Sequence, residues 1–256
     1  MRAVILAGGL GSRLSEETSR IPKPMVEIGG KPIIWHIMKI FAHHGINDFI
    51  VCLGYKGHLI KQYFAEYRLH SGDVTIDLAR GEVEHHRHSS EPWRVTLVDT
   101  GIETGTGGRL KQIGEHLGSD RFCMTYGDGL SDVDISKLIE FHDRHGKLAT
   151  ITAVSPPARF GSLEIEDEFV AKFQEKPAGA NAWINGGFFV LERAALDYVA
   201  GPAMMWEQEP LRRLSEDRQL MAYRHRGFWH PMDTLREKQI LDALWRDGGA
   251  PWKVWR

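Results

Sequence analysis

Short apolar runs rich in β-branched residues alternate, along the first 155 positions, with longer segments whose apolar residues recur every three or four positions. Such runs are typical of buried parallel strands, and such segments are typical of helices that cover a sheet. The predicted strands are residues 3–7, 48–53, 74–79, 95–99, 122–126 and 148–154, and the predicted helices are residues 32–44, 57–69, 107–117 and 134–145. This alternation predicts an α/β fold with a mostly parallel sheet flanked by helices.

The pattern changes after position 155. Shorter apolar runs follow there, at residues 162–165, 170–174 and 187–191. Closer to the carboxyl end, Thr234 stands three residues before Glu237, which is the spacing of a capping box for a helix that runs to Trp245. Because Thr234 caps this predicted helix, the neighbouring Asp233 is left for another role.

A glycine-rich segment follows the first predicted strand. Gly8, Gly9 and Gly11 allow backbone N–H groups to approach an anion with no Cβ in the way, and Arg13 adds a positively charged fork. Ten residues further on, Lys23 lies between two prolines, which predict a stiff and extended segment around it. Ligands bind at the carboxyl ends of parallel strands. The pattern therefore predicts a phosphate-binding loop with two cations.

Two better-known phosphate loops do not match this segment. The dinucleotide fingerprint requires Gly or Ala where Leu14 stands. The P-loop requires Gly-Lys followed by Ser or Thr, whereas Gly30 and Lys31 are followed by Pro32. What remains is Gly-Gly-x-Gly-x-Arg followed by Pro-Lys-Pro.

The motifs of the chain resemble those of the sugar-1-phosphate nucleotidyltransferases and, within that family, of the cytidylyltransferases that act on glucose 1-phosphate. Ser12 and Ile21 depart from the family's commoner threonine and basic residue. The matching segments run from end to end of the chain: LAGGLGSRLSEET (6–18), PKPMVEIGGKP (22–32), EPW (91–93), TGGRL (106–110), YGDG (126–129), FQEKP (173–177), INGGFF (184–189), WEQEP (206–210) and FWHPMDT (228–234).

The resemblance implies a fold and a division of labour. The fold is a Rossmann-like, mostly parallel mixed sheet flanked by helices, with a smaller sugar-binding region. Residues 1–256 then form one nucleotidyltransferase domain. Within it, residues 1–155 are expected to bind mainly the nucleotide, and residues 156–256 to supply mainly the sugar-phosphate-binding part and the C-terminal helix.

The reaction implied is nucleotidyl transfer, in which glucose 1-phosphate attacks the α-phosphorus of CTP and pyrophosphate leaves. The second pKa of a sugar phosphate is about 6, so the attacking group is already an anion at neutral pH and needs no general base. The requirement is instead for positive charge and N–H donors around the phosphates. Arg13, Lys23 and Asp128 are the predicted catalytic residues, with Arg13 suited to the β- and γ-phosphates and Lys23 to the α-phosphate.

The resemblance also assigns binding residues and a cofactor. Mg²⁺ prefers oxygen ligands and retains several waters, and the family pattern implies that Asp128 and Asp233 share it. The predicted sugar-phosphate-binding residues are Gly129, Glu175, Lys176 and Asn185. The predicted nucleotide-binding residues are Leu6, Ala7, Gly8, Gly9, Leu10, Gly11, Ser12, Arg13, Lys23, Thr106, Gly107, Arg109, Gly127 and Asp128.

The segment from Thr106 to Arg109 bears on the choice of base. Thymidylyl and uridylyl relatives resemble one another in carrying a Gly-Leu-Ala or Gly-Thr-Ala type of segment there, whereas this chain has Thr-Gly-Gly-Arg. Cytosine presents an amine donor where uracil and thymine present a carbonyl, so backbone carbonyls around Gly8 and Gly107 are expected to favour CTP. Another nucleotide and sugar phosphate pair remains an alternative.

The composition of the chain limits the classes of partner that we expect it to bind. The chain has 256 residues and a net charge of −2, which leaves no broad basic field for nucleic acid. No apolar run is long enough to cross a bilayer, no signal peptide precedes the first strand, and Cys52 and Cys123 fall inside predicted strands. These features predict a cytoplasmic enzyme with no membrane partner. The aromatic tail, residues 250–256, suggests a homo-oligomer.

Two other classes and one segment stay open. A nucleotide-sugar-dependent glycosyltransferase has a similar layout, but it has no reason to keep Arg13 with Lys23. A non-catalytic phosphosugar-binding regulator would lose Lys23 or an aspartate, and both are present here. Residues 85–88, which include three histidines, are predicted to form a solvated loop because no cysteine or carboxylate stands at ligand spacing.

Overall fold

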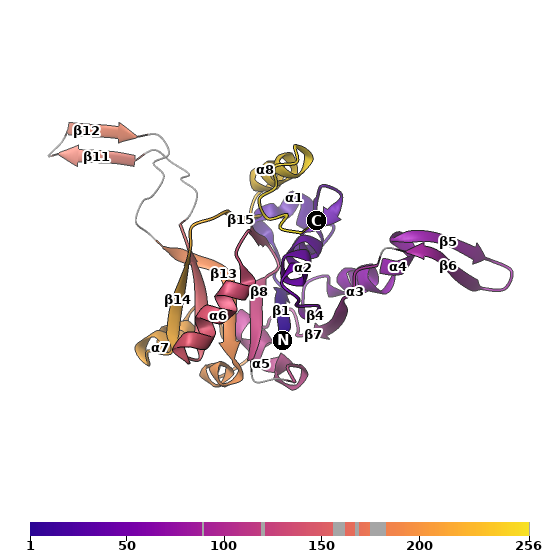
Figure 1. Cartoon of the computed structure of the whole chain (residues 1–256), viewed down its shortest axis with the longest axis horizontal. Coiled ribbons are helices and arrows are strands. Elements are labelled where there is room, and N and C mark those ends of the chain that lie inside the picture. Colours follow the sequence, from indigo (N-terminus) through magenta and orange to yellow (C-terminus); the bar gives the residue numbers. More distant parts are fainter. Residues whose placement is uncertain (89, 119–120, 156–161, 167–168, 175–182, 256) are drawn as a thin grey trace.

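The computed structural model describes residues 1–88, 90–118, 121–155, 162–166, 169–174 and 183–255. Within these residues the centre of the molecule is a seven-stranded sheet with the order β14-β10-β13-β8-β1-β4-β7 (Figure 1). Its strands are β14 (Leu220–His225), β10 (Ala149–Val154), β13 (Ile184–Glu192), β8 (Arg121–Tyr126), β1 (Arg2–Ala7), β4 (Asp48–Leu53) and β7 (Arg94–Asp99). Neighbouring strands are parallel, except that β13 is antiparallel to both β8 and β10. The predicted α/β fold with a mostly parallel mixed sheet is confirmed.

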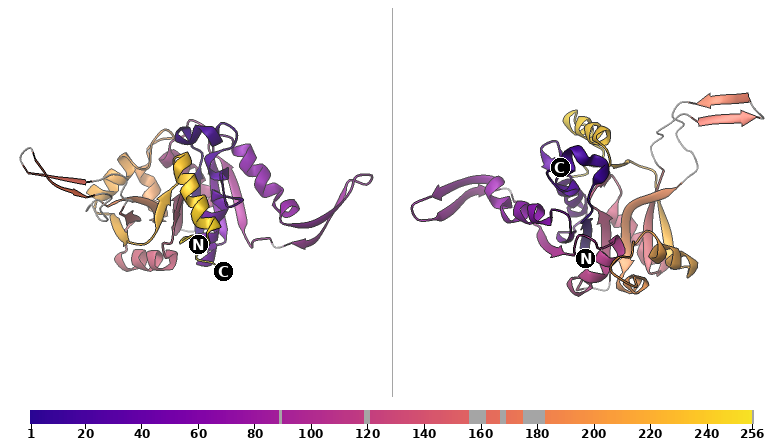
Figure 2. Two further views of the ribbon diagram at one scale, coloured as in Figure 1. Left: turned by 90° about the horizontal axis from the view of Figure 1, so that it is seen from above. Right: turned by 180° about the vertical axis from the view of Figure 1, so that it is seen from behind.

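Helices pack on both faces of this sheet (Figure 2). The α-helices are α1 (Ser15–Thr18), α2 (Ile33–His43), α3 (Gly57–Ala65), α4 (Tyr67–His70), α5 (Thr106–Gln112), α6 (Ile135–His145), α7 (Glu209–Glu216) and α8 (Leu235–Arg246). Short 3₁₀ turns are η1 (Ser12–Leu14), η2 (Lys23–Met25), η3 (Ile113–His116) and η4 (Arg193–Tyr198).

Alternate residues of β1 explain why both faces are covered. Ala3 and Ile5 point into an apolar core that also contains residues of α2, α6 and α8, whereas Val4 and Leu6 point into a second core that contains residues of α5 and α7. A parallel strand that is buried on both faces must be apolar at successive positions, as this one is. The sheet is therefore the platform from which the loops that follow β1 and β8 project.

Several predicted elements differ at their ends. The helix expected over residues 57–69 is divided into α3 and α4, and the helix expected over 107–117 is α5 followed by η3. Pro32 is paired in the short strand β3 (Lys31–Pro32) with β2 (Glu27–Ile28), so α2 begins one residue later than expected. Strand β14, a six-residue strand at the edge of the sheet, was not predicted.

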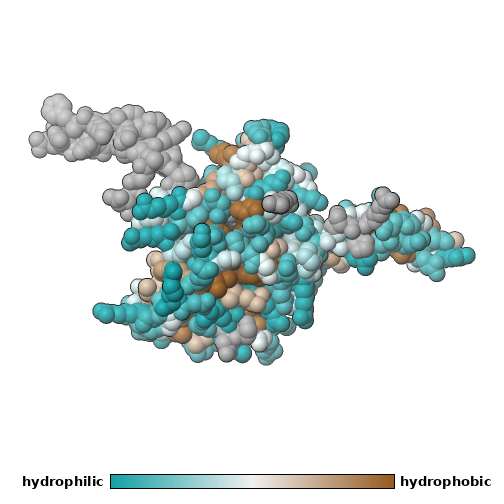
Figure 3. All heavy atoms as spheres, in the orientation of Figure 1, coloured by the Kyte–Doolittle hydropathy of each residue, from teal (hydrophilic) through white to brown (hydrophobic). Residues whose placement is uncertain are grey.

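An arm projects from the body of the molecule (Figures 1 and 2). It consists of the antiparallel strands β5 (Gly72–Asp77) and β6 (Glu82–His88). The prediction of a loop over residues 85–88 is therefore wrong: these residues pair in β6, because a two-stranded hairpin needs no apolar run to form its ladder. The arm is mainly hydrophilic in Figure 3, yet Ile76, Leu78 and Val83 are exposed on it.

A second pair of antiparallel strands, β11 (Ser162–Glu166) and β12 (Phe169–Gln174), comes from the region where short strands were predicted. Both strands were expected, and both are confirmed. Among the described residues, no helix is both long and apolar enough to cross a membrane.

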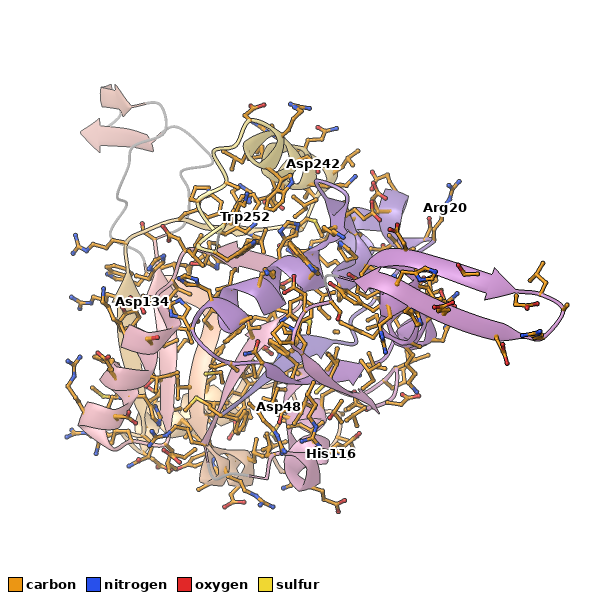
Figure 4. All side chains as sticks on the ribbon, turned by 45° about the vertical axis from the view of Figure 1, so that its right-hand side comes forward. Arg20, Asp48, His116, Asp134, Asp242 and Trp252 are labelled. Atoms are coloured by element: carbon orange, nitrogen blue, oxygen red, sulfur yellow. The ribbon has the colours of Figure 1, made fainter. Side chains whose placement is uncertain are left out.

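The aromatic tail is not an exposed surface. Trp252, labelled in Figure 4, is fully buried and stacks on Phe228 and Trp245. Its indole also donates toward the ring of His36, at 3.4 Å. The sequence-based argument that this tail invites association is therefore wrong, because the tail completes the core beside α2 and α8.

Candidate active site

A cavity of about 380 Å³ opens at the carboxyl ends of β1 and β8. These two strands lie side by side in parallel, with Leu6 opposite Tyr126. The loops that leave them, the glycine-rich loop after Ala7 and the turn that contains Asp128, therefore reach the same edge of the sheet. The cavity is lined by Leu6, Gly8, Gly9, Leu10, Gly11, Ser12, Arg13, Lys23, Pro24, Ile102, Thr104, Gly105, Thr106, Arg109, Tyr126, Gly127, Asp128 and Met205.

Most of the predicted nucleotide-binding residues line this cavity. Of the predicted set, Ala7 and Gly107 are absent from the lining among the described residues. Ala7 is buried at the end of β1, and Gly107 is buried against the backbone of residues 204–206. Both positions are packed against the protein, so any role toward a nucleotide rests on their backbone groups.

The glycine-rich loop is open on the cavity side. A methyl group added to Gly9 would meet no atom within 4 Å, and Gly11 has a left-handed backbone with φ of 64°. An L-residue with a side chain adopts that conformation only with strain, so Gly11 is required for the turn into η1. The expected reason for these glycines, close approach of backbone to an anion, is compatible with the geometry of the loop.

Lys23 is held more rigidly than an ordinary surface lysine. Pro22 is extended, as predicted, but Lys23 itself begins the 3₁₀ turn η2, in which Met25 N–H donates to the Pro22 carbonyl at 2.8 Å. The expectation of an extended backbone at Lys23 is wrong in this detail, because the turn satisfies two backbone groups that an extended strand would leave open. Its side chain is only 11% exposed.

Two carboxylates converge on the Lys23 amine. Lys23 Nζ donates to Asp128 Oδ2 and to Asp233 Oδ1, each at 2.6 Å, so these two oxygens are separated by at most twice that distance. Arg13 donates to the other oxygen of Asp233 at 2.7 Å. The four charged residues predicted for the catalytic and metal site, three of them widely separated in sequence, therefore form one cluster at the mouth of the cavity.

A short ribbon brings Asp233 to Asp128. Strand β9 (Gly129–Ser131) follows Asp128 directly, and it pairs antiparallel with β15 (Trp229–Pro231). The Met232 N–H then donates to the Asp128 carbonyl at 2.8 Å. Neither strand was predicted, because three-residue strands carry almost no periodic signal.

The helix that follows Asp233 begins as predicted. Thr234 caps α8 and accepts from the Glu237 N–H at 3.3 Å, while the Glu237 carboxylate accepts from the N–H groups of Thr234 and Asp233. The predicted capping box is confirmed. Because Thr234 and Glu237 satisfy the helix end, the Asp233 carboxylate is available to the cations of the cluster.

The electrostatics keep Lys23 charged. Burial alone lowers the pKa of its amine, but Asp128 and Asp233 outweigh this cost and raise the pKa above its ordinary value. With Arg13, the cluster holds two positive and two negative groups. It is thus neutral as it stands, and a polyanion would meet no net attraction from it.

A second glycine-rich segment lies across the cavity, at the start of α5, and its glycines are closely packed. A methyl group on Gly108 would overlap the Pro202 carbonyl, and one on Gly107 would come within 2.9 Å of the Met204 carbonyl oxygen. The Gly108 N–H donates to that Met204 carbonyl at 3.1 Å, and the Gly105 N–H donates to the Pro202 carbonyl at 2.9 Å. In this segment the absence of a Cβ allows the backbone at the start of α5 to lie in contact with the backbone of residues 202–206.

Arg109 connects the loops around the cavity through hydrogen bonds. Its guanidinium is almost fully buried, and burial lowers its pKa. It was predicted to be one of the nucleotide-binding residues. It lines the cavity, but much of its donor capacity is already used by oxygens of the loops after β1, β4 and β7. These are the carbonyls of Gly8, Leu53, Gly101 and Ile102 and the hydroxyl of Thr100.

A smaller cavity of about 50 Å³ adjoins the first. Gly129 and Asn185, both predicted to bind the sugar phosphate, line it, and Asp128 and Tyr126 line both cavities. The predicted residues Glu175 and Lys176 lie outside the described residues. Tyr126 was missed as a site residue, although it opens the YGDG segment (126–129) on which the resemblance rests.

The chain is similar to known nucleotidyltransferases over its full length. The family model described as "Nucleotidyl transferase" matches residues 2–255. The chain is 59% identical to glucose-1-phosphate cytidylyltransferase of Salmonella typhi and 44% identical to probable glucose-1-phosphate cytidylyltransferase of Bacillus subtilis, in each case over 256 residues and 100% of both chains. The crystal structure of HddC from Yersinia pseudotuberculosis matches with a TM-score of 0.69 and 23% identity, over 95% of this chain and 99% of that one, which supports the fold.

Proposed function

Because this chain belongs to the nucleotidyl transferase family, we propose that it transfers the cytidylyl group of CTP to α-D-glucose 1-phosphate, with release of pyrophosphate and formation of CDP-glucose. The observation that carries the proposal is the convergence of Arg13, Lys23, Asp128 and Asp233 at the cavity mouth. The relatives at 59% and 44% identity bear the name of this activity. The cluster supports the proposal because it supplies cations for the phosphates and carboxylates for a metal ion.

The chain's own cations act on the phosphates. Lys23 lines the larger cavity, and its amine is held against Asp128, which lines both cavities, so it is suited to the α-phosphate, where the bond to glucose 1-phosphate forms. Arg13 has a side chain that is 73% exposed and is suited to the β- and γ-phosphates, which leave together. Both cations stabilise charge that grows on pyrophosphate as the bond to the α-phosphorus breaks.

The carboxylate pair fits Mg²⁺. Asp128 and Asp233 present oxygens to one point, and oxygen ligands in this number are what Mg²⁺ takes from proteins beside phosphates and water. Among the described residues no group of three or more histidines, cysteines, aspartates or glutamates is arranged to hold a metal, so this pair is our candidate. Bound there, Mg²⁺ would supply the positive charge that makes the otherwise neutral cluster attractive to a triphosphate.

Substrate binding then requires an exchange of partners. In the described structure the carboxylates occupy the N–H donors that the phosphates need. We expect Lys23 and Arg13 to release Asp128 and Asp233 when phosphate oxygens arrive. The raised pKa of Lys23 ensures that its amine is protonated before that exchange at neutral pH.

The base and the sugar are assigned to opposite sides of Tyr126. On the nucleotide side, the Gly8 carbonyl already accepts from the Tyr55 N–H at 3.2 Å and from Arg109 at 3.3 Å, which orients it rigidly beside the place proposed for the base. On the other side, Gly129 and Asn185 line the smaller cavity proposed for the sugar. The Tyr55 and Arg109 donors use both lone pairs of the Gly8 carbonyl, so the acceptor for an amine on the base is left to other groups that line the larger cavity.

Two further predictions, the location and the oligomeric state, are part of the proposal. A cytoplasmic location is supported by the two cysteines, Cys52 and Cys123, which are free and buried. A homo-oligomer is supported by the exposed apolar side chains Ile76, Leu78 and Val83 on the arm rather than by the tail. Neither a nucleic acid nor a membrane is proposed as a partner.

The test is a comparison of substrates. The purified chain is incubated with glucose 1-phosphate, Mg²⁺ and CTP, UTP or dTTP, and pyrophosphate and the sugar nucleotide are measured. We expect kcat/KM for CTP to exceed that for UTP by about tenfold or more. Equal use of dTTP would refute the choice of base and leave the reaction class intact. Absence of pyrophosphate with every nucleotide and sugar phosphate would refute the reaction itself.

A further inference from the structure

Glu207 forms hydrogen bonds with two residues that line the cavities, Thr106 and Tyr126. Its Oε1 accepts from the Tyr126 hydroxyl at 2.5 Å, and its Oε2 accepts from the Thr106 hydroxyl at 2.6 Å. Thr106 lines the larger cavity and Tyr126 lines both, whereas Glu207 is not among the described residues that line either. Glu207 belongs to the segment WEQEP (206–210), which has no role in the function proposed above.

A carboxylate imposes a direction on these hydrogen bonds. An ionised carboxylate only accepts, so both hydroxyls must donate to it and keep their lone pairs for other partners. The Thr106 oxygen accepts from the Trp206 N–H at 2.8 Å, and the Tyr126 oxygen accepts from Asn185 Nδ2 at 3.4 Å. A glutamine at position 207 has a donor on one side and would reverse one of the two hydroxyls.

The same chain of bonds sets the amide of Asn185. Its Oδ1 accepts from the Gly187 N–H at 2.8 Å, and its Nδ2 faces the Tyr126 hydroxyl. With the amide oxygen taken by the backbone, Asn185 presents N–H donors on the side of the smaller cavity. This is the polarity that a sugar hydroxyl or phosphate oxygen requires of it.

The glycines of the second segment place Glu207. Because Gly105, Gly107 and Gly108 lack side chains, residues 202–206 can lie directly on the start of α5. That contact carries position 207 over Tyr126.

We propose that Glu207 is a positioning residue that, through Tyr126, orients Asn185 toward the sugar phosphate and, through Thr106, couples that side to the nucleotide cavity. The inference rests on the proposed function for the identity of the substrates. It assigns Glu207 no direct contact with them.

The test measures KM and kcat for each substrate in four variants. We expect Glu207→Ala to raise KM for glucose 1-phosphate roughly 5- to 10-fold, to raise KM for CTP less, and to change kcat by no more than about threefold. Tyr126→Phe should raise KM for glucose 1-phosphate by a similar factor, and the double variant should add nothing further to it. Glu209→Ala is the matched control: Glu209 stands two residues away and pairs with Arg212. It should match the wild type.

The outcomes are separable. A wild type that forms no CDP-glucose refutes the proposed function. If the wild type forms CDP-glucose but Glu207→Ala has the same KM values as Glu209→Ala, the inference is overturned and the proposed function stands. The inference is also overturned if the increases in KM caused by Glu207→Ala and Tyr126→Phe multiply in the double variant. A crystal structure of Glu207→Ala tests the geometry without turnover: the Tyr126 hydroxyl and the Asn185 amide should leave their observed positions, and unchanged positions overturn the inference whatever the activity.

Discussion

Two glycine-rich segments of this chain look alike in sequence and differ in what their glycines do. After β1, Gly9 meets nothing within 4 Å and the loop opens on the cavity. At the start of α5, a methyl group on Gly107 or Gly108 would press into the backbone of residues 202–206. In the first segment Gly8 makes room for the Arg109 guanidinium, but Gly9 leaves open space beside the cavity. In the second segment the missing side chains leave space only for the backbone of the protein itself.

The difference matters because the sequence alone favours the second segment as the part of the chain that selects the base of the nucleotide. Its glycines are fully accounted for by packing, so they are no evidence of contact with a nucleotide. Arg109, at the end of this segment, contacts the first loop, because its guanidinium donates a hydrogen bond to the Gly8 carbonyl. That carbonyl also accepts from the Tyr55 N–H, so both of its lone pairs are used within the protein, and selectivity for the base is to be sought in other acceptors of the cavity lining.

The largest effect is expected when Lys23, the buried cation beside the glycine-rich loop after β1, is removed. Lys23→Ala removes the buried amine that stands between Asp128 and Asp233 and should lower kcat on the order of 10³-fold while the fold survives. Steady-state pyrophosphate release measures it, with Lys61→Ala, a change on the exposed side of α3, as the control. Near-normal turnover in Lys23→Ala would remove this lysine from the mechanism.

The next effect tests the carboxylate pair. Asp128→Asn keeps the shape of the side chain and removes its charge, so kcat should fall on the order of 10²-fold and recover in part as Mg²⁺ is raised. Mg²⁺ titrations of the variant and the wild type give the comparison. A wild type that stays fully active in excess chelator would contradict the metal site.

A pair of matched substitutions separates the two glycine segments directly. Gly108→Ala gains about 1 kcal/mol of helix propensity, but the new methyl overlaps the Pro202 carbonyl, and the overpacking should lower the free energy of unfolding by about 1–3 kcal/mol net. Gly9→Ala should leave that free energy within about 0.5 kcal/mol and raise KM for CTP instead. Thermal and urea denaturation, beside steady-state kinetics, measure both.

The reverse pattern, with Gly9→Ala unstable and Gly108→Ala stable but defective toward CTP, would invert the comparison. Equal loss of stability in both variants would remove the distinction between a loop that is open to ligand and a segment that is packed against backbone.

The smallest effect concerns the residue that joins the segments. Arg109→Lys keeps the charge but replaces a planar fork of five donors with three donors at one point. Some of the carbonyls around the cavity then lose their partner, and the free energy of unfolding should fall by about 1 kcal/mol. Denaturation curves test this, and a variant as stable as the wild type would show that water replaces the guanidinium without cost.

Much of the site could be predicted because its signals are local. The glycine-rich loop, the stiff segment around Lys23 and the capping box at Thr234 each depend on a few neighbouring residues. Short apolar runs revealed most of the strands, and an apolar period of about 3.6 residues revealed most of the helices. The meeting of Asp128 with Asp233 was implied by resemblance alone, since the three-residue strands β9 and β15 that bring it about carry no periodic signal.

The sequence by itself determined the alternation of strands and helices, the open glycine-rich loop and the residue types of the charged cluster, because these follow from backbone conformation and apolar spacing over a few positions. The tertiary structure alone decided that Gly107 and Gly108 receive a backbone, that Arg109 ties three loops, and that Glu207 reaches Tyr126 across 81 positions. Such contacts depend on the order of strands in the sheet, and no local pattern encodes which distant segments that order brings together.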